Sequence, residues 1–71
     1  MAIDVVAPMP GKIKEIIVKV GDAVKEDDEI LILEAMKMEN PIVADGDGTV
    51  KEIKVKVGDK VTGNQVLVVL E

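Results

Sequence analysis

Residues 11–34 read GKIKEIIVKVGDAVKEDDEILILE, and residues 48–71 read GTVKEIKVKVGDKVTGNQVLVVLE. The two stretches align at a spacing of 37 positions without a gap, and 12 of the 24 pairs are identical. The match continues weakly upstream, where VVA at residues 5–7 pairs with IVA at residues 42–44. Identity in half of the pairs indicates an internal duplication, so the two halves are expected to share one fold.

Each half has the pattern of short β-strands separated by turns. Residues 53–57 alternate aliphatic side chains with lysines, which predicts a strand with one buried and one exposed face. The alternation slips at residues 13–16 and again at residues 50–53, so a β-bulge or a bend is predicted at the same place in both copies. Turn-forming pairs punctuate the rest, as at residues 21–22 and 58–59. This spacing predicts a small all-β sandwich or flattened barrel.

One segment has a conflicting local signal. Residues 29–40, EILILEAMKMEN, are rich in helix-forming side chains. Their repeat partner, VLVVLE at residues 66–71, is rich in β-branched side chains, which favour a strand. Because the copies should share a fold, we predict a strand over residues 30–34.

Length and composition predict a single domain over residues 1–71 with an aliphatic core. The chain is 48% hydrophobic, has no aromatic residue and no cysteine, and carries 9 lysines against 14 acids, a net charge of −5. The core is therefore expected to consist of Val, Ile, Leu, Met and Ala, without a disulfide. Nucleic acids and anionic membranes are poor partners for such a chain.

The residue inventory argues against an enzyme. The chain has no Ser, His, Cys, Tyr, Trp, Phe or Arg, which leaves carboxylates, lysines, amides, Thr49 and Thr62 for chemistry. We expect no catalytic residues and no metal site of the His/Cys type. The longest run of large aliphatic residues is five residues, whereas a membrane helix needs about 20. With no signal peptide, these features predict a cytoplasmic protein without direct membrane insertion.

The join between the two copies contains the candidate site. It reads AMKMENP over residues 35–41, whereas tight hairpins favour Asn-Gly, Asp-Gly or Gly-Gly. A non-glycine residue held at positive φ costs roughly 1–2 kcal/mol, and local rules tend to be broken at functional sites. Lys37 is therefore the candidate functional lysine. The alternative is one more solvated lysine, with Met36 and Met38 folded back to fill the core.

A two-fold relation between the halves would place this join at one end of the barrel and both termini at the other. A group on Lys37 would then point away from whatever the termini are attached to, which suits a carrier that presents a cargo to other proteins.

The join also resembles a known family. EAMKM at residues 34–38 is similar to the attachment motif of biotinyl domains in biotin-dependent carboxylases and decarboxylases. APMPG at residues 7–11 and VGDAV at residues 20–24 resemble two further motifs of that family, so the similarity covers nearly the whole chain. The resemblance implies a flattened barrel of two four-stranded antiparallel sheets with quasi-two-fold symmetry, and it implies that Lys37 lies at a hairpin tip.

The resemblance also implies a function. Biotin would be joined to the Lys37 side chain by an amide bond, installed by a biotin protein ligase from biotinyl-AMP. The biotinyl arm would carry a carboxyl group between a biotin carboxylase and a carboxyltransferase or decarboxylase subunit, and the domain itself would be a non-catalytic carrier. The residues implied in ligase recognition flank the lysine: Glu34, Ala35, Met36, Met38 and Glu39.

Three departures from the family pattern stand out. Residues 12–20 leave no room for the protruding thumb of some bacterial acetyl-CoA carboxylase carriers, so no thumb is expected. Asp27 stands where the family often has glycine. The chain opens without an Ala/Pro-rich linker, which fits either an excised domain or a small separate subunit.

Two other functions remain as alternatives. A lipoyl carrier domain of a 2-oxo acid dehydrogenase shares the fold and modifies a lysine at the same kind of turn. Such domains usually place an acidic residue before the lysine and alanine after it, whereas Met36 and Met38 flank Lys37 here. An unmodified lipoyl-like binding module would need no AMKM motif.

Overall fold

The computed structural model describes residues 2–71, and its regular elements are all β-strands. No helix in this described part of the chain is long and apolar enough to span a membrane. The strands pair antiparallel in two four-stranded sheets, with the orders β1-β8-β6-β3 and β5-β4-β2-β7. The predicted all-β class and two-sheet architecture are confirmed. The strands are β1 (Ile3–Val6), β2 (Gly11–Ile16), β3 (Ala23–Val24), β4 (Glu29–Ala35), β5 (Met38–Val43), β6 (Gly48–Ile53), β7 (Lys60–Val61) and β8 (Val66–Leu70).

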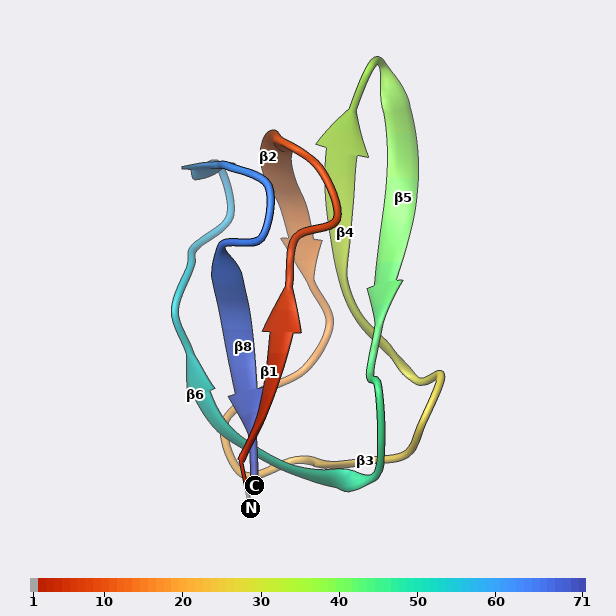
Figure 1. Ribbon diagram of the computed structural model, residues 1–71, viewed down its shortest axis with the longest axis vertical. Helices are drawn as coiled ribbons and strands as arrows, with labels where there is room; N and C mark the ends of the chain where they lie inside the picture. Colours follow the sequence, from red (N-terminus) through yellow and green to blue (C-terminus); the bar gives the residue numbers. More distant parts are fainter. Residues whose placement is uncertain (1) are drawn as a thin grey trace.

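The duplication is visible in the topology. The shift that aligns the two copies places β1–β4 on β5–β8, and it converts the strand order of one sheet into that of the other. Each sheet therefore contains strands from both halves of the chain (Figure 1). The backbone repeats as well, because Gly21 and its counterpart Gly58 have φ angles of 98° and 96°. The quasi-two-fold relation follows from this exchange of strands.

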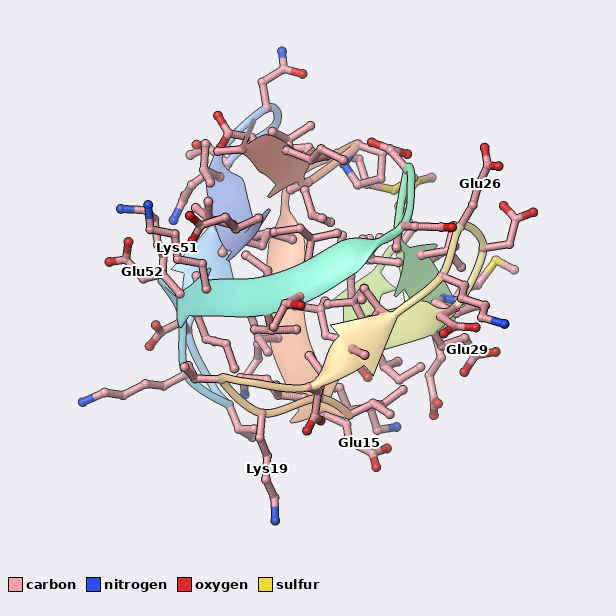
Figure 2. The ribbon with its side chains drawn as sticks, turned by 90° about the horizontal axis from the view of Figure 1, so that it is seen from below. Glu15, Lys19, Glu26, Glu29, Lys51 and Glu52 are labelled. Atoms are coloured by element: carbon pink, nitrogen blue, oxygen red, sulfur yellow. The ribbon has the colours of Figure 1, made fainter. Side chains whose placement is uncertain are left out.

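Both predicted β-bulges are present. The register shifts between Ile13 and Glu15 where β2 pairs with β4, and it shifts at the same place where β6 pairs with β8. Lys14 in β2 and Lys51 in β6 are left out of these ladders. Figure 2 shows the consequence at the second bulge, where Lys51 and Glu52 both point outward. A bulge adds one residue to one strand only, so two consecutive side chains can face solvent.

The prediction of one strand that continues to Val57 is wrong. β6 ends at Ile53, and the chain then crosses from one sheet to the other. After this crossing, the amide of Gly58 donates a 2.8 Å hydrogen bond to the carbonyl of Ile13 in β2, a strand of the second sheet. Val55 stays buried during the crossing, but Val57 is 62% exposed. The alternation of residues 53–57 thus reflects burial at the start of a crossover rather than one continuous strand.

The core lies between the two sheets and is purely aliphatic. No polar or charged residue is buried among residues 2–71. The expected core of Val, Ile, Leu and Ala is confirmed, whereas methionine contributes little: Met9 is partly buried against the core, and Met36 and Met38 are exposed. The largest fully buried side chains are Ile13, Ile30, Leu31, Leu33, Leu67, Leu70, Val5, Val50 and Val68.

The two ends of the long axis differ in what they present. The molecule measures 32 × 17 × 17 Å. Ile3 pairs with Leu70, so the first and last strands meet at one end, and the β4–β5 hairpin lies at the other (Figure 1). The predicted separation of the mid-chain join from the chain ends is confirmed.

Candidate functional site: the β4–β5 hairpin

The hairpin between β4 and β5 has an unfavourable turn sequence. Ala35 pairs with Met38, so the loop contains only Met36 and Lys37. Their φ angles are 54° and 64°, the left-handed conformation that type I′ hairpin turns require at both positions. Neither residue is glycine, asparagine or aspartate, which tolerate this conformation best. The predicted positive φ at non-glycine residues is confirmed, and it falls on Lys37 itself.

The side chains at the tip point into solvent. Met36 is 89% exposed, Met38 is 65% exposed, and Lys37 is exposed between them. The alternative in which both methionines fill the core is therefore wrong. Among residues 2–71, the Lys37 ammonium makes no ion pair or side-chain hydrogen bond. Two exposed thioethers thus flank a lysine that no neighbouring side chain holds in place.

The base of the hairpin is held more firmly than its tip. Ala35 is buried, and Asn40 in β5 donates a 3.2 Å hydrogen bond from its side-chain amide to the carbonyl of Met38. Asn40 also pairs in register with Leu33, which is fully buried. The sequence reasoning missed Asn40. No sequence signal pointed to it, because residues 35–41 were expected to form the join between the two copies and not a strand.

An ion pair supports the same hairpin from β2. Glu34 and Glu39 lie directly opposite each other in β4 and β5. The Lys14 ammonium donates a hydrogen bond to the Glu39 carboxylate across the intervening strand. This hydrogen bond, together with the negative charge of Glu39, raises the pKa of Lys14 above its usual value. Lys14 is exposed, but its ammonium neutralises one of the two opposed glutamates.

All the residues predicted around the site are close together in the structure. Glu34, Met36, Met38 and Glu39 are exposed on the two strands or the turn that carry Lys37. Ala35 differs, because it is buried. Thr49 and Thr62 lie elsewhere, in β6 and next to β7, and do not belong to the hairpin.

Comparison with known proteins assigns the family. The family described as biotin-requiring enzyme matches residues 3–70. The chain belongs to this family. The biotin carboxyl carrier protein of Streptococcus mutans is 63% identical over 38 residues, which cover 54% of this chain and 29% of that protein. The glutaconyl-CoA decarboxylase subunit gamma of Acidaminococcus fermentans is 57% identical over 42 residues, covering 59% of this chain and 29% of the subunit.

A solved structure resembles the fold of this family member over its full length. The urea carboxylase of Kluyveromyces lactis superimposes with a TM-score of 0.95 and 31% identity, covering 100% of this chain and 6% of that enzyme. The chain thus spans less than a third of the length of the carrier protein and of the decarboxylase subunit, and a small part of the urea carboxylase.

The chemistry at the tip fits the group that the family name implies. Biotin is a carboxylic acid, and it can be joined to a protein as an amide of a primary amine. Lys37 offers such an amine on an exposed turn, with no carboxylate among the described residues paired to it. A lysine in an ion pair would have to lose its partner before acylation, whereas Lys37 has no such partner among residues 2–71.

Proposed function

We propose that this chain is a biotin carboxyl carrier domain over residues 1–71, with biotin attached to Lys37 through an amide bond. The observation that carries the proposal is the presentation of Lys37. It is exposed on a two-residue turn, has no ion-pair partner among residues 2–71, and lies at the end of the barrel opposite the first and last strands (Figure 1). Biotin, when attached, supplies the ureido group that carries a carboxyl unit between enzymes.

Contacts at the base of the hairpin support this role. Asn40 and the Lys14–Glu39 ion pair hold the strands on either side of the turn, and the tip itself projects beyond them. A tethered arm on such a tip can reach two enzyme sites in turn while its effective concentration at each stays high. The domain itself supplies attachment and presentation, and its partner subunits supply catalysis.

The partners follow from the same proposal. A biotin protein ligase would acylate Lys37: the bond from its side-chain nitrogen to the biotin carboxyl carbon forms, AMP leaves, and the amine loses a proton. A biotin carboxylase would load the arm, and a carboxyltransferase or decarboxylase subunit would unload it. The cited relatives are named as a carboxyl carrier and a decarboxylase subunit, which favours this role over lipoyl transfer.

The residues that we propose the ligase reads surround Lys37. Glu34, Met36, Met38 and Glu39 offer two thioethers and two carboxylates at the surface of the hairpin. Ala35 would act differently, because its buried methyl group lets the end of β4 pack against the barrel.

A carboxyl-transfer experiment tests the carrier function. The chain is first biotinylated and then incubated with a biotin carboxylase, ATP and radiolabelled bicarbonate. We expect the label to be retained on the wild-type chain and absent from Lys37→Arg, which keeps the positive charge at the tip. Equal labelling of the two chains, or no label on a fully biotinylated wild-type chain, would contradict the proposal.

A further inference from the structure

A shallow groove lies beside the hairpin. Its volume is about 390 Å³, and Met36 is one of its lining residues. Its apolar lining consists of Pro10, Gly11, Ala35 and Val61, from the start of β2, the end of β4 and β7. Figure 1 shows the start of β2 close to the end of β4, below the tip of the hairpin. The groove is therefore next to the residue that carries the proposed arm.

Two lysines face each other at this groove. Lys12 in β2 and Lys60 in β7 are direct partners in the ladder and both line the groove. Like charges directly opposite each other destabilise a sheet. Neither lysine makes an ion pair with any of residues 2–71. This holds although Glu34, in β4 on the other side of β2, is directly opposite Lys12 in the strand pairing. Two unpaired cations thus lie together on a chain with a net charge of −5.

The second copy of the repeat shows that the fold does not need these charges. The positions equivalent to Lys12 and Lys60 are Thr49 and Ala23, and these two residues are ladder partners in the other sheet. The same strand pairing is therefore built without any charge at the opposite end of the barrel. The lysine pair exists only beside the hairpin, where the proposed cargo is carried.

We propose that Lys12 and Lys60 form an anion subsite that receives the carboxylate carried at the end of the loaded Lys37 arm. The inference rests on the proposed function for the identity of the cargo. The groove offers apolar surface to the body of the arm and two ammonium groups to its charged end. Glu34 repels the same carboxylate and so lowers the affinity of the subsite for it. A low affinity suits a carboxyl group that must be transferred to a second enzyme site.

The distances along the strands allow the arm to reach. Lys37 is three residues beyond Glu34, a span of at most about 10 Å in extended chain. Glu34 lies directly opposite Lys12, and adjacent strands are about 4.8 Å apart. The lysine side chain, lengthened by the acyl chain and rings of biotin, can fold back over Met36 to cover this distance.

The subsite can be tested without biotin. Because the chain has no cysteine, Lys37→Cys creates a unique thiol. Two thiol-reactive arms of equal length are attached, one ending in a ¹³C-labelled carboxylic acid and the other in the corresponding primary amide. The pKa of the labelled carboxyl group is measured by ¹³C NMR, and the backbone amide shifts of Gly11 and Ala35 are recorded for both arms.

The measurement is repeated in two matched variants. Lys12→Thr combined with Lys60→Ala introduces the residues of the second copy, so it should be at least as stable as the parent in thermal unfolding. Lys19→Thr combined with Lys25→Ala removes the same amount of charge elsewhere; Figure 2 shows Lys19 pointing into solvent at the end remote from the hairpin. Thermal unfolding of all variants establishes that each is folded.

We expect the carboxyl pKa on the parent chain to lie roughly 0.5–1 unit below that of the same arm on a free thiol. The depression should shrink in high salt, vanish in the Lys12/Lys60 variant, persist in the Lys19/Lys25 variant and increase with Glu34→Gln. The Gly11 and Ala35 amides should respond to the acid arm only when it is ionised. An equal pKa in all variants, or equal amide shifts with both arms, would overturn the subsite. Neither result depends on ligase recognition, so a chain that fails to be biotinylated would refute only the proposed function.

Discussion

Replacing the turn at the hairpin tip should stabilise the protein while it removes the site. Met36 and Lys37 have φ angles of 54° and 64°, and each non-glycine residue in this conformation costs roughly 1–2 kcal/mol. Lys37→Gly removes that cost but loses about 0.5–1 kcal/mol to the greater freedom of glycine in the unfolded chain. Met36→Asn should add roughly a few tenths of a kcal/mol to the free energy of unfolding, because asparagine tolerates the left-handed conformation. The double variant should therefore gain about 1 kcal/mol in free energy of unfolding.

Thermal unfolding measures this gain directly. For a domain of this size, about 1 kcal/mol corresponds to a rise in Tm of about 4–8 °C. Lys37→Ala is the matched control, because it removes the lysine but keeps a Cβ atom at positive φ, so its Tm should not rise. Both variants should lose biotinylation. If the Asn-Gly variant is no more stable than Lys37→Ala, the turn is not strained and its residues need another explanation.

Three further predictions concern the supports of the hairpin. A Cβ atom at Gly11 would lie 2.6 Å from the carbonyl oxygen of Glu34, whereas one at Gly48 would lie 3.1 Å from its nearest neighbour. Gly11→Ala should therefore lower the free energy of unfolding, measured in urea, by about 1–3 kcal/mol and by more than Gly48→Ala. Equal losses in the two variants would contradict the close approach at Gly11. The raised pKa of Lys14 implies a stability contribution that is complete below the usual lysine pKa of about 10.4 and lost as pH rises through the higher folded value. The wild type should thus lose more stability than Lys14→Gln between pH 10 and 12, and parallel curves would exclude that contribution. Replacing Glu34 and Glu39 together by glutamine should slow enzymatic biotinylation more than Lys14→Gln, which removes the same ion pair but keeps both carboxylates. A rate equal to that of the wild type would remove both glutamates from ligase recognition.

The strands were largely predictable because the sequence is duplicated. Taken alone, residues 29–40 resemble a helix, and only the repeat partner at residues 66–71 indicates β4. The bulges were predictable for the same reason, since a slip in the alternation that occurs in both copies marks a structural feature. The strained turn at Lys37 followed from residue types that do not suit a tight hairpin.

Other features depend on which strands become neighbours, and the local periodicity of the sequence does not predict strand neighbours. Val55 and Val57 alternate with lysines, but the chain changes sheets there and only Val55 is buried. The ion pair between Lys14 and Glu39 depends on the bulge in β2 and on the register of two strands on either side of β4. The pairing of Lys12 with Lys60 likewise depends on the exchange of strands between the two halves.

The most direct test of the carrier function is the intact mass of the chain, followed by peptide mapping, after co-expression with a biotin protein ligase and free biotin. We predict one biotinyl group per chain, on Lys37 and on none of the other eight lysines. An unmodified chain in the presence of a ligase that is active on a control substrate, or biotin on a different lysine, would contradict it.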